Sequence, residues 1–224
     1  MTETRLSPPN KIIHSEFIGQ ISYREGLARQ EQALAGLIHD GHSYSGVVLG
    51  FEHPPVITLG VRGKSQDDLA IDSELIQARG IELVQVPRGG QATVHSPGQL
   101  VVYPCLRLRD LNLSPRCFVS KMEQVTQACL ADFGIDAVKG EREPGLFVSG
   151  KKIAAFGFHI SRGLTSHGIA INVSNDLSLF GLIRTCGIVR QPITSLVDQG
   201  CRYSVAEVFA AWVARVNSDL KSCS

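Results

Sequence analysis

Two side chains within residues 144–188 have the chemistry of a covalent catalyst. Lys152 stands at the start of an apolar run, and Cys186 is followed at once by a glycine. A cysteine becomes a nucleophile when a nearby cation stabilises its thiolate and lowers the pKa of the thiol from about 8.5. We therefore expect Lys152 to activate Cys186, which would then carry an acyl group. The alternative is that Cys186 is a small buried side chain of the core, as isolated cysteines often are.

A second stretch, residues 87–103, is suited to binding a ligand through its backbone. Gly89-Gly90 permits backbone angles and close approaches that a side chain would prevent, and Arg88 precedes the pair. The stretch lacks the GxxxxGK[ST] pattern of a phosphate-binding loop, so a nucleotide phosphate is not its obvious target. Apolar and polar side chains alternate over residues 92–95, as they do on the two faces of a strand. The alternative here is a glycine turn beside a histidine that is hydrogen-bonded within the protein.

Strands must position both stretches. Two β-type segments, 153–160 and 165–173, are joined by a Ser-Arg-Gly turn, which predicts a hairpin. The continuous apolar run 46–51 is typical of a strand covered on both faces. Further strands are predicted at 11–17, 56–59, 82–86, 100–103, 135–138 and 194–196. Helices are predicted at 23–39, 73–78, 115–133 and 205–220, with N-caps at Ser22, Ser114 and Ser204 for the first, third and fourth.

Composition narrows the functional class. The 224 residues suit one domain with a substantial core, and 22 basic residues nearly cancel 21 acidic ones. No basic block indicates nucleic acid, and no apolar run reaches the roughly 20 residues that span a membrane. Six cysteines show neither CxxC nor Cys/His ligand spacing, so we expect no metal site. The polar N-terminus lacks the apolar region of a signal peptide, and free thiols are typical of a reducing, cytoplasmic location.

Four motifs, in order, resemble those of the octanoyl (lipoyl) transferase family. Residues 88–99 (RGGQATVHSPGQ) resemble its RGGxxTxHGPGQ signature, and residues 152–157 (KIAAFG) resemble its lysine strand. Residues 166–173 (SHGIAINV) resemble its HGxAxNV strand, and residues 186–188 (CGI) resemble its catalytic cysteine motif. Residues 58–60 (TLG) and 176–178 (DLS) also fit. Together the motifs place the resemblance over about residues 20 to 200.

The resemblance implies an α+β fold, a single catalytic domain of the biotin/lipoate protein ligase type with a mixed sheet flanked by helices. That domain would span residues 11–224, after a flexible arm of residues 1–10. The implied reaction moves an octanoyl (or lipoyl) group from acyl carrier protein to a specific lysine of lipoyl domains. Those domains belong to the E2 subunits of 2-oxo-acid dehydrogenases and to the H protein of glycine cleavage. The phosphopantetheine thioester of the donor is already activated, so we expect no cofactor, and a monomer suffices.

The same resemblance assigns roles to individual residues. Cys186 would hold the acyl thioester, and Lys152 would lower the pKa of its thiol and relay protons. The predicted substrate-binding residues are Arg88, Gly89, Gly90, Gln91, Ala92, Thr93, Val94, His95, Ala155, Phe156, Gly157, Gly168, Ile169 and Ala170. The chain departs from the family at Val94, usually tyrosine, at Ser96, usually glycine, and at Arg184-Thr185, where Asn-Pro is common. These departures bear on rate and acyl-chain preference more than on the class of reaction.

Two other functions fit parts of the pattern. An ATP-dependent lipoate or biotin ligase of the same fold also uses a strand lysine, but it binds an acyl-adenylate and needs no cysteine. The motif at Cys186 argues against it. A non-catalytic protein that binds acyl groups or lipoyl domains would never acquire an octanoyl adduct.

Overall fold

A mixed seven-stranded sheet forms the centre of the protein in this computed structural model. The model describes residues 12–39, 44–63, 68–141, 143–184 and 192–220. The strands lie in the spatial order β1-β2-β6-β10-β9-β8-β7, with β1 and β2 parallel and the other neighbours antiparallel. They are β1 (Ile13–Gln20), β2 (Gly46–Glu52), β6 (Gln99–Leu106), β7 (Val138–Lys139), β8 (Leu146–Val148), β9 (Lys151–Ser161) and β10 (Leu164–Asn172). This sheet and its helices confirm the predicted α+β class.

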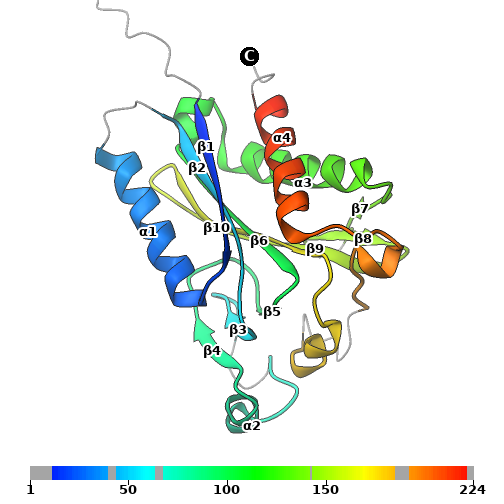
Figure 1. The fold of residues 1–224 in the computed structure, drawn as a ribbon. Coiled ribbons are helices and arrows are strands. Elements are labelled where there is room, and N and C mark those ends of the chain that lie inside the picture. The colour runs from blue at the N-terminus through cyan, green and yellow to red at the C-terminus, as the bar shows by residue number, and fades with distance from the viewer. Residues whose placement is uncertain (1–11, 40–43, 64–67, 142, 185–191, 221–224) are drawn as a thin grey trace, which may run out of the picture.

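Helices cover both faces of the sheet. Figure 1 shows α1 on one side and α3 with α4 on the other. The helices are α1 (Tyr23–His39), α2 (Ser73–Ala78), α3 (Pro115–Asp132) and α4 (Val205–Asp219). All three predicted serine N-caps are present, because the Oγ atoms of Ser22, Ser114 and Ser204 accept hydrogen bonds from backbone N–H groups three residues later. At Ser22 and Ser204 the serine N–H in turn donates to the carboxylate of the glutamate three residues later, which completes a capping box.

The two-sided cover explains the composition of the central strands. Along β6, Leu100 and Val102 belong to the core under α3 and α4, whereas Val101 and Tyr103 belong to the core under α1. Side chains alternate between the faces of a strand, so a strand with both faces buried is apolar throughout. Residues 46–51, which were predicted to form a strand covered on both faces, lie in β2. Its side chains are likewise buried on both faces of the sheet.

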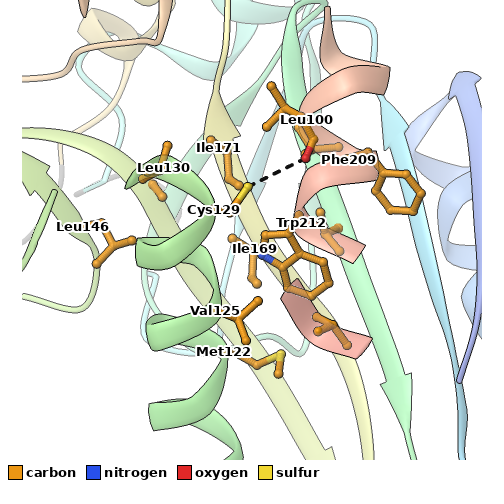
Figure 2. Close-up of a cluster of buried hydrophobic side chains, with 14 of the residues drawn as sticks. Leu100, Met122, Val125, Cys129, Leu130, Leu146, Ile169, Ile171, Phe209 and Trp212 are labelled. Carbon is orange, nitrogen blue, oxygen red and sulfur yellow. Dashed lines mark hydrogen bonds between the residues drawn. The ribbon is translucent and has the colours of Figure 1, made fainter. Parts of the chain in front are cut away.

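Figure 2 shows the larger core, where α3 and α4 meet over β6 and β10. Trp212 is fully buried there, and its Nε1–H donates to the hydroxyl of Thr126 at 2.9 Å. Cys129 lies in the same core, with its sulfur 3.9 Å from the carbonyl oxygen of Val208 (Figure 2). Burial raises the pKa of Cys129 to about 12, and that of Cys105 likewise. Neither thiol is therefore a nucleophile near neutral pH.

A smaller sheet positions the glycine-bearing stretch. Its strands lie in the order β4 (Glu82–Gln85), β3 (Val56–Leu59) and β5 (Ala92–His95). The connection from β4 to β5 crosses the end of β3, and residues 88–91 of this connection are called here the glycine loop. Residues 60–62 donate three backbone hydrogen bonds to the glycine loop, at 3.0 to 3.2 Å. The end of β3 thus fixes the loop in place.

The predicted hairpin is confirmed. Strands β9 and β10 pair in antiparallel register from Ser161↔Leu164 to Ala154↔Ile171. Arg162 and Gly163, at the turn, have φ values of 50° and 76°. A two-residue hairpin loop with a type I′ turn requires positive φ at both residues.

Two predicted strands are wrong. Of residues 135–138 only Val138 lies in a strand, because the N–H groups of Ile135 and Ala137 bond to nearby carbonyls after the end of α3. Residues 194–196 form no strand either. Thr194 bonds instead to the backbone of Lys152 in β9, and Leu196 bonds to the end of β10. The predicted N-terminal arm, residues 1–10, lies outside the described residues.

Within the described ranges, no helix combines the length and the apolar character needed to cross a membrane.

Candidate active site

A cavity opens where the glycine loop packs against β9, with the N–H of Gly89 donating to the carbonyl of Phe158 at 3.1 Å. The cavity has an empty volume of about 1060 Å³, which includes space open to solvent. Lys152 and all the predicted substrate-binding residues except Val94 line it. The latter are Arg88, Gly89, Gly90, Gln91, Ala92, Thr93, His95, Ala155, Phe156, Gly157, Gly168, Ile169 and Ala170. The fold brings three separate motifs to one cavity, and their roles in binding stay predictions.

Val94 does not line the cavity. Its side chain is 1% exposed and packs with Ile57 and Leu59 in the core of the smaller sheet. The alternation along β5 explains this position, because Thr93 and His95 face the cavity and the side chain between them must point the other way. An apolar residue is what that core accepts.

Arg88 joins the glycine loop to β3. Its guanidinium donates to the hydroxyl of Thr58 from Nε at 3.1 Å and from Nη2 at 2.7 Å, and Nη2 also donates to the carbonyl of Thr58. Nη1 donates to the carbonyl of Gly89 at 3.0 Å. These partners are neutral oxygens, and burial lowers the pKa of the guanidinium. A β-carbon at Gly60 would lie 2.4 Å from the carbonyl oxygen of Gly90, so the contact between β3 and the loop requires glycine.

The two glycines of the glycine loop differ in what their backbone N–H groups bond to among the described residues. The N–H of Gly89 is used in the bond to β9. Gly90 has a φ of 93°, which favours glycine. Its carbonyl accepts from the N–H of Arg62, while its own N–H has no partner among the described residues. Of the two loop glycines, Gly90 is therefore the one able to donate to a ligand.

Neutral polar rings form another part of the cavity wall. His95 is buried, its Nδ1 lies 2.7 Å from Oε1 of Gln99, and burial lowers its pKa to about 3. Burial, followed by the charge of Arg88, lowers the pKa of His167 to about 4. Tyr23 stacks on His95 with ring centroids 5.9 Å apart, and burial raises the pKa of this tyrosine. None of these groups is charged at neutral pH, so neither histidine is suited to be a strong general base there.

Lys152 lies near the start of β9 with its side chain only 14% exposed. Its Nζ atom is 3.0 Å from Oε2 of Glu143 and 5.3 Å from the centroid of the Phe147 ring. Its backbone is held as well, because its N–H donates to the carbonyl of Pro192 at 2.8 Å and its carbonyl accepts from the N–H of Thr194 at 3.0 Å. The lysine is therefore fixed at both backbone and side chain.

Cys186 lies outside the described residues, as does Thr185, so the predicted pairing of Cys186 with Lys152 stays a prediction. The described residues on either side border the cavity. Ile183 forms an isolated bridge with Leu69, and Ile193 forms one with Lys152. Both isoleucines line the cavity.

Sequence reasoning missed several residues of the cavity, among them Glu143, Tyr23 and Tyr103. Glu143 lies in a charged loop, residues 140–144, whose pattern favours a solvated turn, yet its side chain is only 15% exposed and is paired with Lys152. Tyr23 and Tyr103 also line the cavity. Nothing local in the sequence marks the tyrosines, because they reach the cavity only when α1 packs over β6.

Known proteins share both the sequence and the fold. The family model of the lipoyl protein ligase A/B catalytic domain matches residues 22–217. The chain is 43% identical over 191 residues to the octanoyltransferase of Solibacter usitatus, a match that covers 85% of each chain. It is 36% identical to that of Caldanaerobacter subterraneus, over 85% of this chain and 82% of the relative. The chain belongs to the octanoyltransferase family. Membership supports octanoyl transfer in lipoylation as its activity.

Solved structures agree on the fold alone, since their sequence identities are low. The putative lipoate protein ligase Ta0514 of T. acidophilum, with bound lipoic acid, aligns with a TM-score of 0.74 at 17% identity, over 93% of this chain and 86% of its own. A lipoate-protein ligase A bound with ATP aligns with a TM-score of 0.73 at 18% identity, over 94% and 85%.

Proposed function

We propose that this octanoyltransferase-family protein transfers an octanoyl (or lipoyl) group from acyl carrier protein to a specific lysine of lipoyl domains, through a thioester on Cys186. The acceptors are E2 subunits of 2-oxo-acid dehydrogenases and the H protein of glycine cleavage. One observation carries the proposal: a fixed lysine stands at the edge of a cavity that is bordered on both sides by the ends of the segment containing Cys186.

The chain that leads to Cys186 is held beside the cavity as far as it is described. The N–H of Arg184 donates to the carbonyl of Asp68 at 2.7 Å, next to the bridge between Leu69 and Ile183. Ile183 lines the cavity, so the described chain reaches the cavity just before the segment that contains Cys186.

The chemistry needs two acyl transfers and no added cofactor. In the first, the Cys186 sulfur bonds to the acyl carbon of the donor thioester, the bond to the pantetheine sulfur breaks, and the proton of the cysteine ends on that leaving thiol. In the second, the acceptor amine bonds to the same carbon, the bond to Cys186 breaks, and a proton of the amine returns to the cysteine. A thiolate suits both steps as nucleophile and as leaving group.

The described residues supply the surroundings that these steps need. Ala155, Phe156, Ile169 and Ala170 give the cavity an apolar wall suited to a fatty-acyl chain. The N–H of Gly90 is available for the oxyanion that develops on the acyl carbonyl. Lys152 would stabilise the thiolate of Cys186 and pass on its proton. His95 and His167, neutral at pH 7, would orient the acyl group.

Intact mass spectrometry tests the proposal. Wild-type protein incubated with octanoyl acyl carrier protein should gain a hydroxylamine-labile octanoyl group, and Cys186→Ser should not. Cys117→Ser is the matched control, because Cys117 is an exposed free thiol on α3, and it should be acylated like wild type. Folded wild-type protein without an adduct would refute the mechanism. If Cys186→Ser joined free octanoate to a lipoyl domain with ATP, the protein would instead be a ligase.

A further inference from the structure

We propose that Glu143 is a positioning residue for Lys152: its carboxylate holds the lysine Nζ in place at the edge of the cavity. The two side chains are 3.0 Å apart at Oε2 and Nζ, both line the cavity, and they are 15% and 14% exposed. This inference rests on the proposed role of Lys152 in acyl transfer. It assigns a second residue to that role, in the loop before β8.

Burial distinguishes this ion pair from pairs at the surface. The pair between Arg24 and Glu82 has a similar distance of 3.0 Å, but its side chains are 83% and 36% exposed. Water screens such a pair, and its loss has little consequence. At the cavity edge, removal of the carboxylate would leave the lysine charge mostly out of water with one partner fewer, so the side chain would move to find another.

The loop itself is shaped around the lysine. The N–H of Gly140 donates to the carbonyl of Gly145 at 3.1 Å and closes the loop. A β-carbon at Gly145, where φ is 152°, would lie 2.9 Å from Cε of Lys152. A β-carbon at Gly140 would lie 2.3 Å from the carbonyl oxygen of Glu143. Both glycines therefore permit the loop to fold back until Glu143 reaches Lys152.

The charges of the cavity also single out this contact. Among its described lining residues Glu143 is the only carboxylate, whereas Arg62, Arg88 and Lys152 are cations. Arg88 has its own neutral partners around Thr58. The carboxylate lies against Lys152, the cation to which the proposed mechanism gives a task. The Nζ atom also lies 5.3 Å from the centroid of the Phe147 ring, so the two contacts together restrict where Nζ can lie.

The first measurement is chemical and needs no acyltransferase activity. Protein is treated briefly with an amine-acetylating reagent, and fragment ions of the proteolysed chain give the labelling of Lys152 relative to the exposed neighbour Lys151. Glu143→Gln should raise this ratio at least fivefold, and Glu143→Asp should raise it less. Glu141→Gln, a matched change at an exposed position of the same loop, should leave it unchanged. An unchanged ratio in folded Glu143→Gln protein would overturn the proposal.

The second measurement is the rate of octanoyl-adduct formation in a single turnover. At saturating donor, Glu143→Gln should slow the reaction at least tenfold, with the donor concentration for half-maximal rate within twofold of wild type, and Glu143→Asp should restore part of the rate. A raised labelling ratio with an unchanged rate would also overturn the proposal. If wild type forms no adduct at all, the proposed function fails, while the labelling ratio still decides whether Glu143 holds the lysine.

Discussion

The buried histidines of the cavity should make the folded protein sensitive to mild acid. His95 and His167 are 6% and 3% exposed, and their pKa values fall to about 3 and about 4, mainly through burial. In the unfolded chain a histidine has a pKa of about 6.5. Between the two values the unfolded state binds a proton that the folded state does not bind. The free energy of unfolding must therefore decrease as the pH falls below about 6.5, and level off below the folded-state values.

The size of the effect follows from the same values. Each pH unit by which the pH falls within this window lowers the free energy of unfolding by about 1.4 kcal/mol per histidine. At pH 5, about 1.5 units below the unfolded value, each of the two histidines should cost about 2 kcal/mol, or about 4 kcal/mol together. Burial also lowers the pKa of His53, which acts in the same direction. Carboxyl groups with lowered pKa, such as Glu25 and Asp132, act only below about pH 4.5.

Urea unfolding at pH 7 and pH 5 measures the effect. Wild type should lose about 4 kcal/mol of unfolding free energy between the two, and His95→Gln should lose about 2 kcal/mol, since one titrating group is gone. His14→Gln, a change on the exposed side of β1, should keep the wild-type loss. A free energy that stays level or rises from pH 7 to pH 5 would refute the reasoning. If His95→Gln loses as much unfolding free energy as wild type between pH 7 and pH 5, His95 does not contribute to the acid sensitivity.

Three further substitutions test the packing around the cavity and the N-cap of α4. Thr58→Val removes the hydroxyl that accepts two hydrogen bonds from buried Arg88. Urea unfolding should show that the free energy of unfolding falls by about 2–3 kcal/mol, and the rate of octanoyl transfer should decrease. Thr58→Ser keeps the hydroxyl and should retain the wild-type stability and rate. Gly168→Ala places a β-carbon 1.9 Å from the carbonyl oxygen of Val102. Thermal unfolding should show that the free energy of unfolding falls by about 3 kcal/mol or more. A midpoint temperature equal to that of wild type would contradict this packing. Ser204→Ala removes the N-cap of α4 and should cost about 1 kcal/mol by the same assay.

The parts of the fold that were predictable from sequence are those fixed by near neighbours. A serine cap acts over three residues, and so Ser22, Ser114 and Ser204 mark the helix starts correctly. The Ser-Arg-Gly turn acts over two residues and fixes the hairpin of β9 and β10. Residues 135–138 have the composition of a strand, but they follow α3 so closely that their N–H groups bond locally.

The position of a residue follows from the sequence where one motif sets it, and not where tertiary packing decides. The glycine loop and β9 line one cavity, whereas Val94 does not, because its side chain packs in the core of the smaller sheet. Glu143 has the charge pattern of a solvated turn. What turns it inward is the folding of its loop back onto β9, which Gly140 and Gly145 permit and which the charge pattern does not encode.

The fold alone does not decide how the acyl group is activated, since a lipoate-protein ligase bound with ATP shares it at 18% identity. The local structure of this chain is more informative. The backbone of Lys152 is bonded to residues 192 and 194, at the far end of the segment that contains Cys186. The lysine strand and the cysteine segment are thus tied together by backbone bonds that do not depend on the identity of the side chains between them. A scaffold of this kind can keep its lysine whether or not a cysteine is present, so acylation of Cys186, rather than the lysine, separates a transferase from a ligase.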